Sequence, residues 1–327
     1  MKESFLSPIP PSNREKYIVT PSGPDRNTFV EQAFKGKEIF EFGTERNQTE
    51  KVQVIDIPAD EKNPKSTVFI APGFGEVVET LEPNIKYFAE EGRRTLTYNS
   101  LTGVSPEYAE KSNQSEVPDF SERKLAIIEK IIREKNLEGI TGVGHSEGAA
   151  NLIFTALRNP AAFKNLILID PIGLMGDDSV AGLFARFAEH TFRSAQISRA
   201  DMERNELDKK SKEERIKVVT ENPLQAIRAL VALSKIRIED ILRVMKKREV
   251  RISIIHGTDD VLFPMERMQQ MVDSKMIDGF YSIRGGHNDY FLEPEKYSFV
   301  ASSAIEALEN KAQKESALQK GTSLILL

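Results

Sequence analysis

Short apolar runs alternate with segments of helical periodicity from Lys37 onward. Runs that predict buried strands are KVQVIDIPA, STVFIAPGFG, RRTLTYNS, LEGITGVGHS, NLILIDPIG, RISIIHGTDD and GFYSIRGGHN. This alternation is typical of a mostly parallel sheet covered by helices on both faces, and it predicts an α/β fold. Polar residues follow several of these runs, where such sheets place ligands and chemistry. The intervening helices are predicted at Pro83 to Glu91, Phe120 to Lys135, Gly148 to Leu157 and Pro264 to Val272.

Two segments depart from this alternation. Residues 1–36 are rich in Pro, Ser, Asn and Gly, which favours an irregular lead-in over a helix. Residues 177–249 contain no convincing strand, and patterns such as SVAGLFARFAEHTFRSAQ predict a helical cap inserted into the core. The predicted core is therefore formed by residues 37–176 and 250–327. Near its end, SSAIEALENKAQKESALQK predicts a charged helix, whereas the apolar GTSLILL that follows receives no assignment.

Composition narrows the class of protein. The chain has 327 residues, of which 39% are hydrophobic and 29% charged, as in globular proteins. A net charge of -5 disfavours a nucleic-acid or anionic-membrane binder, and the lack of cysteine excludes disulfides and thiolate catalysis. With no signal-like or membrane-spanning apolar run, a cytoplasmic protein without an integral membrane segment is expected. The sequence does not fix the oligomeric state.

The stretch TGVGHSEGAAN, residues 141–151, allows two interpretations. Its glycines come close to the dinucleotide-binding fingerprint, and Asp170 follows at the distance of a ribose-binding acid, so an NAD(P)-binding oxidoreductase is one alternative. Its third glycine is displaced by one position, however, and several strands precede the loop. Gly144, Ser146 and Gly148 instead form G-x-S-x-G, the turn that carries a catalytic serine. This second interpretation requires an acid and then a histidine later in the chain.

Both partners follow in that order. IIHGTDDVLFP is a β-branched strand that runs into Asp259 and Asp260, and SIRGGHNDYF is a strand that runs into the glycine-flanked His287. The other histidines offer no pair at ligand spacing, so neither a metal site nor a cofactor is expected. Asp170 also ends a strand and is a back-up candidate for the acid, although a capping or loop-bonding role suits it better.

With these motifs the chain resembles the α/β-hydrolase superfamily over about residues 52–307. GHSEG resembles its nucleophile elbow, APGFGE its oxyanion loop, GTDDVLFP its acid loop of pattern G-x-x-D-x-x-x-P, and GGHND its histidine loop. Many members have histidine where this chain has Pro72, at a position that is usually structural. The pattern of the acid loop selects Asp260 over Asp259. The resemblance implies an α/β-hydrolase fold, a mostly parallel doubly wound sheet with an inserted helical cap.

The resemblance also implies a role for each matched residue. Ser146 would attack an acyl carbon, His287 would act as general base with a pKa near the ordinary imidazole value, and Asp260 would orient its ring. A serine hydrolase that cleaves a small carboxylic ester or related acyl substrate, without a cofactor, is expected. The alternative within this fold is a ligand-binding protein with slow or absent turnover. The remaining implied site residues are Gly144 and Gly148, which make room at the elbow, and Phe74 and Glu147, whose backbone N–H groups would form the oxyanion hole.

Overall fold

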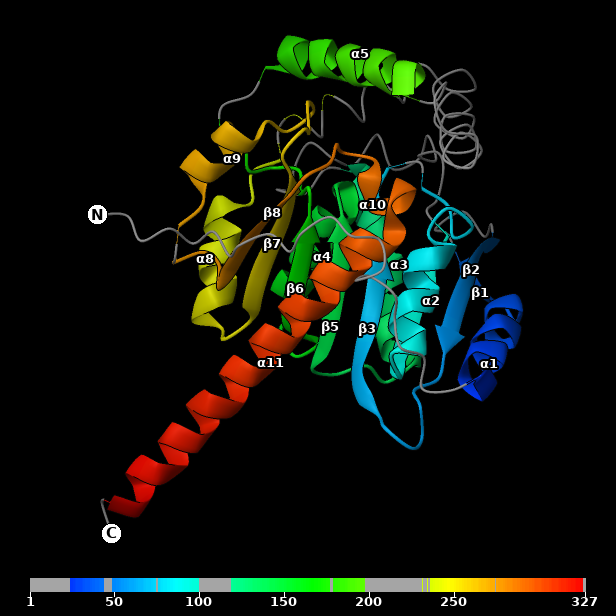
Figure 1. Cartoon of the computed structure of the whole chain (residues 1–327), viewed down its shortest axis with the longest axis vertical. Helices are drawn as coiled ribbons and strands as arrows, with labels where there is room; N and C mark the ends of the chain where they lie inside the picture. Colours follow the sequence, from blue (N-terminus) through cyan, green and yellow to red (C-terminus); the bar gives the residue numbers. More distant parts are fainter. Residues whose placement is uncertain are drawn as a thin grey trace.

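An eight-stranded, mostly parallel sheet forms the centre of the molecule (Figure 1). The computed structural model describes residues 24–43, 49–74, 76–99, 119–176, 179–197, 231, 234, 236–273 and 275–325. Within them the strand order is β1-β2-β4-β3-β5-β6-β7-β8, with antiparallel pairing only at β1–β2 and β2–β4. The strands are β1 (Glu38–Gly43), β2 (Thr49–Ile57), β3 (Lys65–Ala71), β4 (Arg93–Tyr98), β5 (Ile140–His145), β6 (Phe163–Ile169), β7 (Arg251–Gly257) and β8 (Gly279–Ile283). The predicted α/β fold is confirmed.

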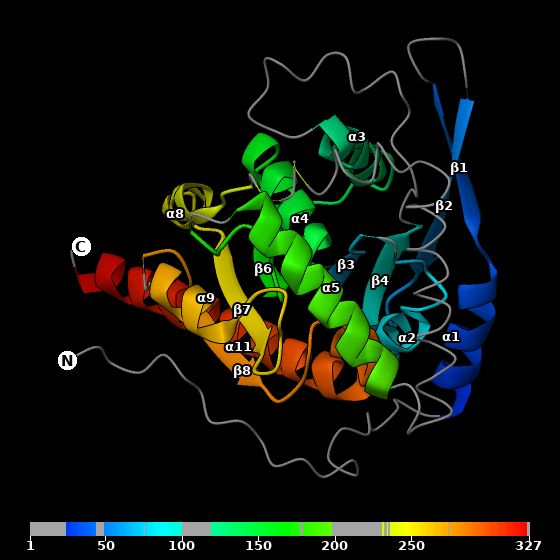
Figure 2. The ribbon, with the colours of Figure 1, turned by 90° about the horizontal axis from the view of Figure 1, so that it is seen from above.

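The central strands are apolar on both faces because helices cover both. In β6, Leu166 and Leu168 face one hydrophobic cluster, and Ile167 and Ile169 face the other. Seen from above, α3, α4 and α8 lie on one side of the sheet, and α1, α2 and α11 lie on the other (Figure 2). The helices are α1 (Pro24–Lys35), α2 (Glu82–Glu90), α3 (Asp119–Glu134), α4 (Glu147–Arg158), α5 (Val180–Ile197), α8 (Glu239–Lys247), α9 (Met265–Met271), α10 (Asp289–Leu292) and α11 (Pro294–Ile325).

Helix α1 corrects the predicted irregular lead-in. Pro24 opens the helix, where its missing N–H would have no helical partner in any case. Val30 and Phe34, one turn apart, are buried in the cluster that includes α2 and β2. The burial of each side chain stabilises the fold by about 1.5 to 3 kcal/mol. The prediction gave the prolines and polar residues more weight than this apolar stripe. Residues 1–23 lie outside the described part of the chain.

The predicted cap is also corrected at its end. Helix α5 follows β6 and lies above the edge of the sheet where the parallel strands end (Figure 1). Helix α8, which was predicted to belong to the cap, instead packs on α4 and β7, with Leu242 and Met245 fully buried. A core helix and a cap helix show the same apolar period, so the sequence pattern could not separate them. Residues 198–230 lie outside the described part of the chain.

Helix α11 continues without a break through the predicted charged helix and into the unassigned apolar tail. It crosses one face of the sheet and extends past the body of the molecule at its C-terminal end (Figure 1). Among the described residues, no helix is both long and apolar enough to span a membrane.

Candidate active site

Ser146 occupies a tight turn between β5 and α4. Its backbone has φ 53° and ψ -115°, a conformation that is strained for a residue with a side chain. The flanking glycines permit the turn: a Cβ on Gly144 would lie 2.7 Å from the backbone nitrogen of Ala149, and one on Gly148 would lie 2.1 Å from the carbonyl oxygen of Ala71. The Ser146 N–H donates to the Ile169 carbonyl at 2.9 Å, which fixes the turn against β6.

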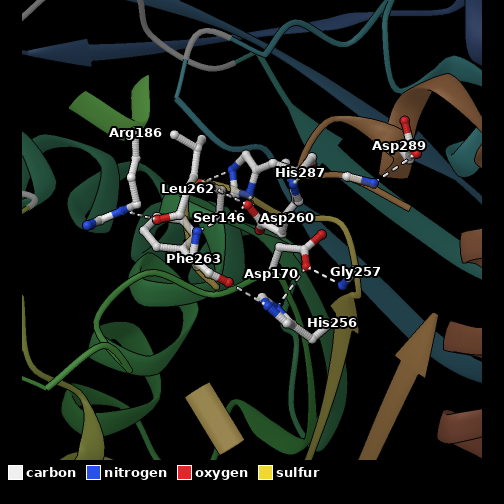
Figure 3. A network of polar contacts seen from close by, with 12 residues as sticks. Ser146, Asp170, Arg186, His256, Gly257, Asp260, Leu262, Phe263, His287 and Asp289 are labelled. Atoms are coloured by element: carbon white, nitrogen blue, oxygen red, sulfur yellow. Dashed lines mark hydrogen bonds and ion pairs between the residues drawn. The ribbon is translucent and has the colours of Figure 1, made fainter. Parts of the chain in front are cut away.

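His287 and Asp260 converge on this serine (Figure 3). The Nε2 atom of His287 lies 3.0 Å from the Oγ of Ser146, and its Nδ1 lies 2.8 Å from Oδ2 of Asp260. A carboxylate can only accept, so Nδ1–H donates to Asp260 and Nε2 is left to accept the serine proton. Asp259, the rival acid, is exposed to solvent. The structure therefore brings together the three residues that the motifs selected.

The loop after β7 holds the Asp260 carboxylate in place. Its second oxygen, Oδ1, accepts the N–H groups of Leu262 at 2.8 Å and Phe263 at 3.1 Å. Burial raises the pKa of Asp260, and these two donors oppose that rise. Burial and, after it, the neighbouring positive charge of His145 lower the pKa of His287 to about 3. The ring of His287 is thus kept neutral, as a base requires.

Asp170 supports the acid loop from behind. It ends β6 with φ 43°, and its Oδ1 accepts the Gly257 N–H at 2.8 Å and lies 2.9 Å from Nδ1 of His256. The Nε2–H of His256 donates to the Phe263 carbonyl at 2.7 Å. Burial lowers the pKa of His256, but Asp170, the charge of Asp260 and the Phe263 carbonyl together raise it above the ordinary value. Asp170 therefore bonds loops together, while Asp260 contacts His287.

Asp170, His256 and Asp260 are close enough to be considered as metal ligands, because one ligand atom from each lies within 4.8 Å of the others. Both oxygens of Asp260 and the Nε2 of His256 already bond to the protein. Within this group, Oδ2 of Asp170 and Nδ1 of His256 are buried atoms that make no hydrogen bond. The remaining contacts of the group tie the acid loop to β6 and support the triad.

The two predicted oxyanion-hole residues follow two neighbouring strands of the sheet, β3 and β5. Phe74 follows β3, and Glu147 is the first residue of α4. The Glu147 carboxylate pairs with Lys124 at 2.7 Å in a buried ion pair. Lys124 also lies over the Phe74 ring, 5.9 Å from its centroid. The assignment of the two backbone N–H groups as donors stays a prediction. Gly75, which follows Phe74 in this loop, lies outside the described part of the chain.

The sequence analysis missed four side chains that lie near the triad. Glu76 and His145 form a buried pair, and Nε2 of His145 lies 2.8 Å from the backbone carbonyl oxygen of His287. From α5, His190 places its ring perpendicular to that of His287, with centroids 6.0 Å apart. One helical turn earlier, Arg186 Nε donates to the Leu262 carbonyl at 2.7 Å (Figure 3). The spacing of Arg186 and His190 put them on one helix face, but nothing in the sequence indicated what that face contacts.

The fold and this site define a serine hydrolase of the α/β-hydrolase superfamily. The chain belongs to the family described as serine aminopeptidase, S33, whose model matches residues 62–278. The serine interpretation of the glycine-rich loop thus prevails over the dinucleotide-binding one. No curated protein matches the chain.

Solved structures of hydrolases share the fold at low sequence identity. A membrane phospholipase A described as a bacterial virulence factor is 16% identical, with a TM-score of 0.61, covering 86% of this chain and 90% of its own. The esterase EaEST from Exiguobacterium antarcticum is 18% identical, with a TM-score of 0.59 and coverage of 81% and 98%. A structure from a study of carboxylesterases of Nitrososphaera gargenis is 14% identical, with a TM-score of 0.58 and coverage of 83% and 100%.

Proposed function

We propose that the protein hydrolyses carboxylic esters through a triad of Ser146, His287 and Asp260. The observation that carries the proposal is the continuous chain of contacts from Asp260 Oδ2 to His287 at 2.8 Å and from His287 Nε2 to Ser146 Oγ at 3.0 Å. These contacts begin at a buried carboxylate and end at a serine held in a strained turn. It is the arrangement that activates an alcohol for attack on an acyl carbon.

The reaction follows from these positions. Ser146 Oγ attacks the acyl carbon while its proton passes to Nε2 of His287, and Asp260 stabilises the resulting imidazolium. The N–H groups of Phe74 and Glu147 would donate to the oxyanion. The intermediate then collapses, the carbon–oxygen bond to the alcohol breaks, and His287 returns the proton to the leaving oxygen. Water attacks the acyl-enzyme in the same way, and the acid is released with Ser146 regenerated.

Three buried carboxylates near the serine are already paired, so they do not supply a partner for the amino end of a peptide. An aminopeptidase must hold a substrate ammonium group, for which a carboxylate is the natural partner. Among the described residues near the serine, Glu76 pairs with His145, Glu147 with Lys124, and Asp170 with His256. Each of these carboxylates is buried and already neutralised, so none is available to a charged substrate.

A substrate panel tests the proposal. Wild type and Ser146→Ala are assayed on p-nitrophenyl esters of increasing chain length and on an aminoacyl p-nitroanilide. We expect ester turnover that falls by at least about a thousandfold in Ser146→Ala, because the covalent nucleophile is lost. Turnover of the anilide but not of the esters would overturn the ester assignment. A variant within tenfold of wild type would overturn the triad.

Fluorophosphonate labelling separates the enzyme from a ligand-binding protein of the same fold. The reagent modifies a serine only when a base activates it, so we expect labelling of the wild type at Ser146 and none in Ser146→Ala. A correctly folded wild type that resists the reagent would favour the ligand-binding alternative.

A further inference from the structure

A second carboxylate–histidine pair lies behind the triad. Oε2 of Glu76 accepts the Gly73 N–H at 2.6 Å, and Oε1 contacts Nδ1 of His145. The other ring nitrogen of His145, Nε2, lies 2.8 Å from the backbone carbonyl oxygen of His287. Glu76, His145 and His287 are 4%, 1% and 5% exposed, so water does not compete for these contacts.

The contacts, together with the pKa directions of both groups, indicate that this pair is charged. A backbone carbonyl only accepts, so Nε2 of His145 carries a proton and donates it to His287. Nδ1 faces a carboxylate, which makes both ring nitrogens donors and His145 an imidazolium. Burial disfavours both charges, but the contact with His145 outweighs burial and lowers the pKa of Glu76, while Glu76 raises the pKa of His145. Each charge is therefore sustained by the other.

This pair connects three loops that the proposed reaction must hold in register. Gly73 precedes Phe74 in the predicted oxyanion loop, His145 precedes the nucleophile, and the last contact reaches the backbone of the base itself. The ring of His145 also packs on that of His287, with centroids 4.8 Å apart. The triad acid fixes the His287 ring from its Nδ1 side, whereas His145 fixes the same residue through its main chain.

We propose that Glu76 and His145 are positioning residues, which hold the His287 backbone and the oxyanion loop at fixed places relative to Ser146. The inference rests on the proposed function. Its effect falls on the chemical step rather than on substrate binding, because the pair is buried behind the triad and acts only through the groups that it orients. A misplacement of reacting groups by about 1 Å can cost about a hundredfold in rate.

The test replaces His145 with Gln or with Asn. Both variants also carry Glu76→Gln, so that no carboxylate is left buried without a partner. In Glu76→Gln/His145→Gln, the amide nitrogen of residue 145 extends about as far as Nε2 and can donate to the His287 carbonyl. In Glu76→Gln/His145→Asn, the side chain is one methylene shorter and cannot reach it. Glu79→Gln is the control, because Glu79 forms a half-buried ion pair with Lys37 away from the triad.

The readouts are the rate of fluorophosphonate labelling, kcat and KM on an ester, and the melting temperature. We expect the His145→Gln double variant to label at least tenfold faster than the His145→Asn one, with a difference in kcat, similar KM values and similar melting temperatures. Glu79→Gln should match the wild type. Equal rates in the two double variants would overturn the inference.

A further comparison remains decisive if the shorter variant does not fold. The His145→Gln double variant keeps the donor to His287, so its kcat should lie within tenfold of Glu76→Gln. A loss above a hundredfold would overturn the inference. Absence of labelling in the wild type would overturn the proposed function and this inference together, whereas the comparisons above bear on the inference alone.

Discussion

At the scale of the residue, the elbow depends on glycines, which have no Cβ atom. Ser146 adopts a strained backbone, and the helix after it approaches β3 so closely that the Ala71 carbonyl leaves no space for a Cβ at Gly148. The same close approach brings the start of α4 beside the loop that follows β3. A glycine at this position is therefore a requirement of the site's geometry and not only of the local turn.

Substitution of Gly148 tests this requirement. Gly148→Ala would place a Cβ 2.1 Å from a backbone oxygen that cannot move freely, so we expect a loss of several kcal/mol in the free energy of unfolding, on the scale of an overpacked core, and little labelling of Ser146. Gly139→Ala is the matched control, since it has φ 59° but no atom within 4 Å of the added Cβ. It should cost only about 1 kcal/mol. Urea denaturation of both variants gives the comparison, and equal losses would contradict the argument.

The two adjacent aspartates make a second prediction at this scale. Asp260→Asn should lower kcat/KM by about ten-thousandfold, because an amide in contact with Nδ1 favours the wrong tautomer of His287. Asp259→Asn should leave kcat/KM within about threefold of wild type, because its side chain is exposed. Steady-state assays on one ester settle the order. A larger loss in the Asp259 variant would move the acid to that residue.

The pH profile follows from the environment of His287. Burial lowers its pKa to about 3, so the ring remains a neutral base well below the ordinary imidazole range. We expect kcat/KM to stay level as pH falls through about 6.5, with its acid limb at lower pH. In the unfolded chain His287 binds a proton below about pH 6.5, whereas in the folded protein it stays neutral. The free energy of unfolding should therefore decrease as pH falls below that value. An acid limb centred at pH 6.5 or above would contradict the prediction.

At the scale of the element, α5 places two side chains beside the triad. Arg186 bonds to the peptide of Leu262 beside the triad acid, and His190 packs on His287. On the same helix, Phe187 is half-buried against the core, whereas Phe184 is 39% exposed. We propose that α5 belongs to a cap whose apolar side chains help to form the acyl pocket.

Trimming this helix tests the cap. Phe187→Ala should change the preference among esters of different chain length by about 1 to 3 kcal/mol, because an apolar pocket gains or loses that much for each methylene. Phe29→Ala is a suitable control, since Phe29 is 42% exposed on α1. The measurement is kcat/KM across the ester panel. An equal loss for every ester would indicate a structural role instead. The side chain of Phe192, on the same helix, lies outside the described residues.

At the scale of the whole molecule, the predictable features were those encoded in short segments. Continuous β-branched runs predicted the core strands, and the glycine-flanked Ser146 and His287 indicated their loops. Features that depend on contacts between distant segments escaped prediction. Three such contacts are the pairing of Glu76 with His145, the packing of α8 on the core, and the approach of His190 to His287. Each joins segments far apart in the sequence, and a local sequence pattern does not show which distant segments meet.

The order of the strands has a consequence for folding during synthesis on the ribosome. Ser146 follows β5 near the middle of the chain, whereas its base follows β8, the last strand in sequence and one edge of the sheet. Because synthesis proceeds from the N-terminus, the nucleophile emerges long before the histidine that activates it. A nascent chain that has folded its first strands therefore carries an inert serine. Esterase activity, if measured during translation, would report completion of the sheet rather than its beginning.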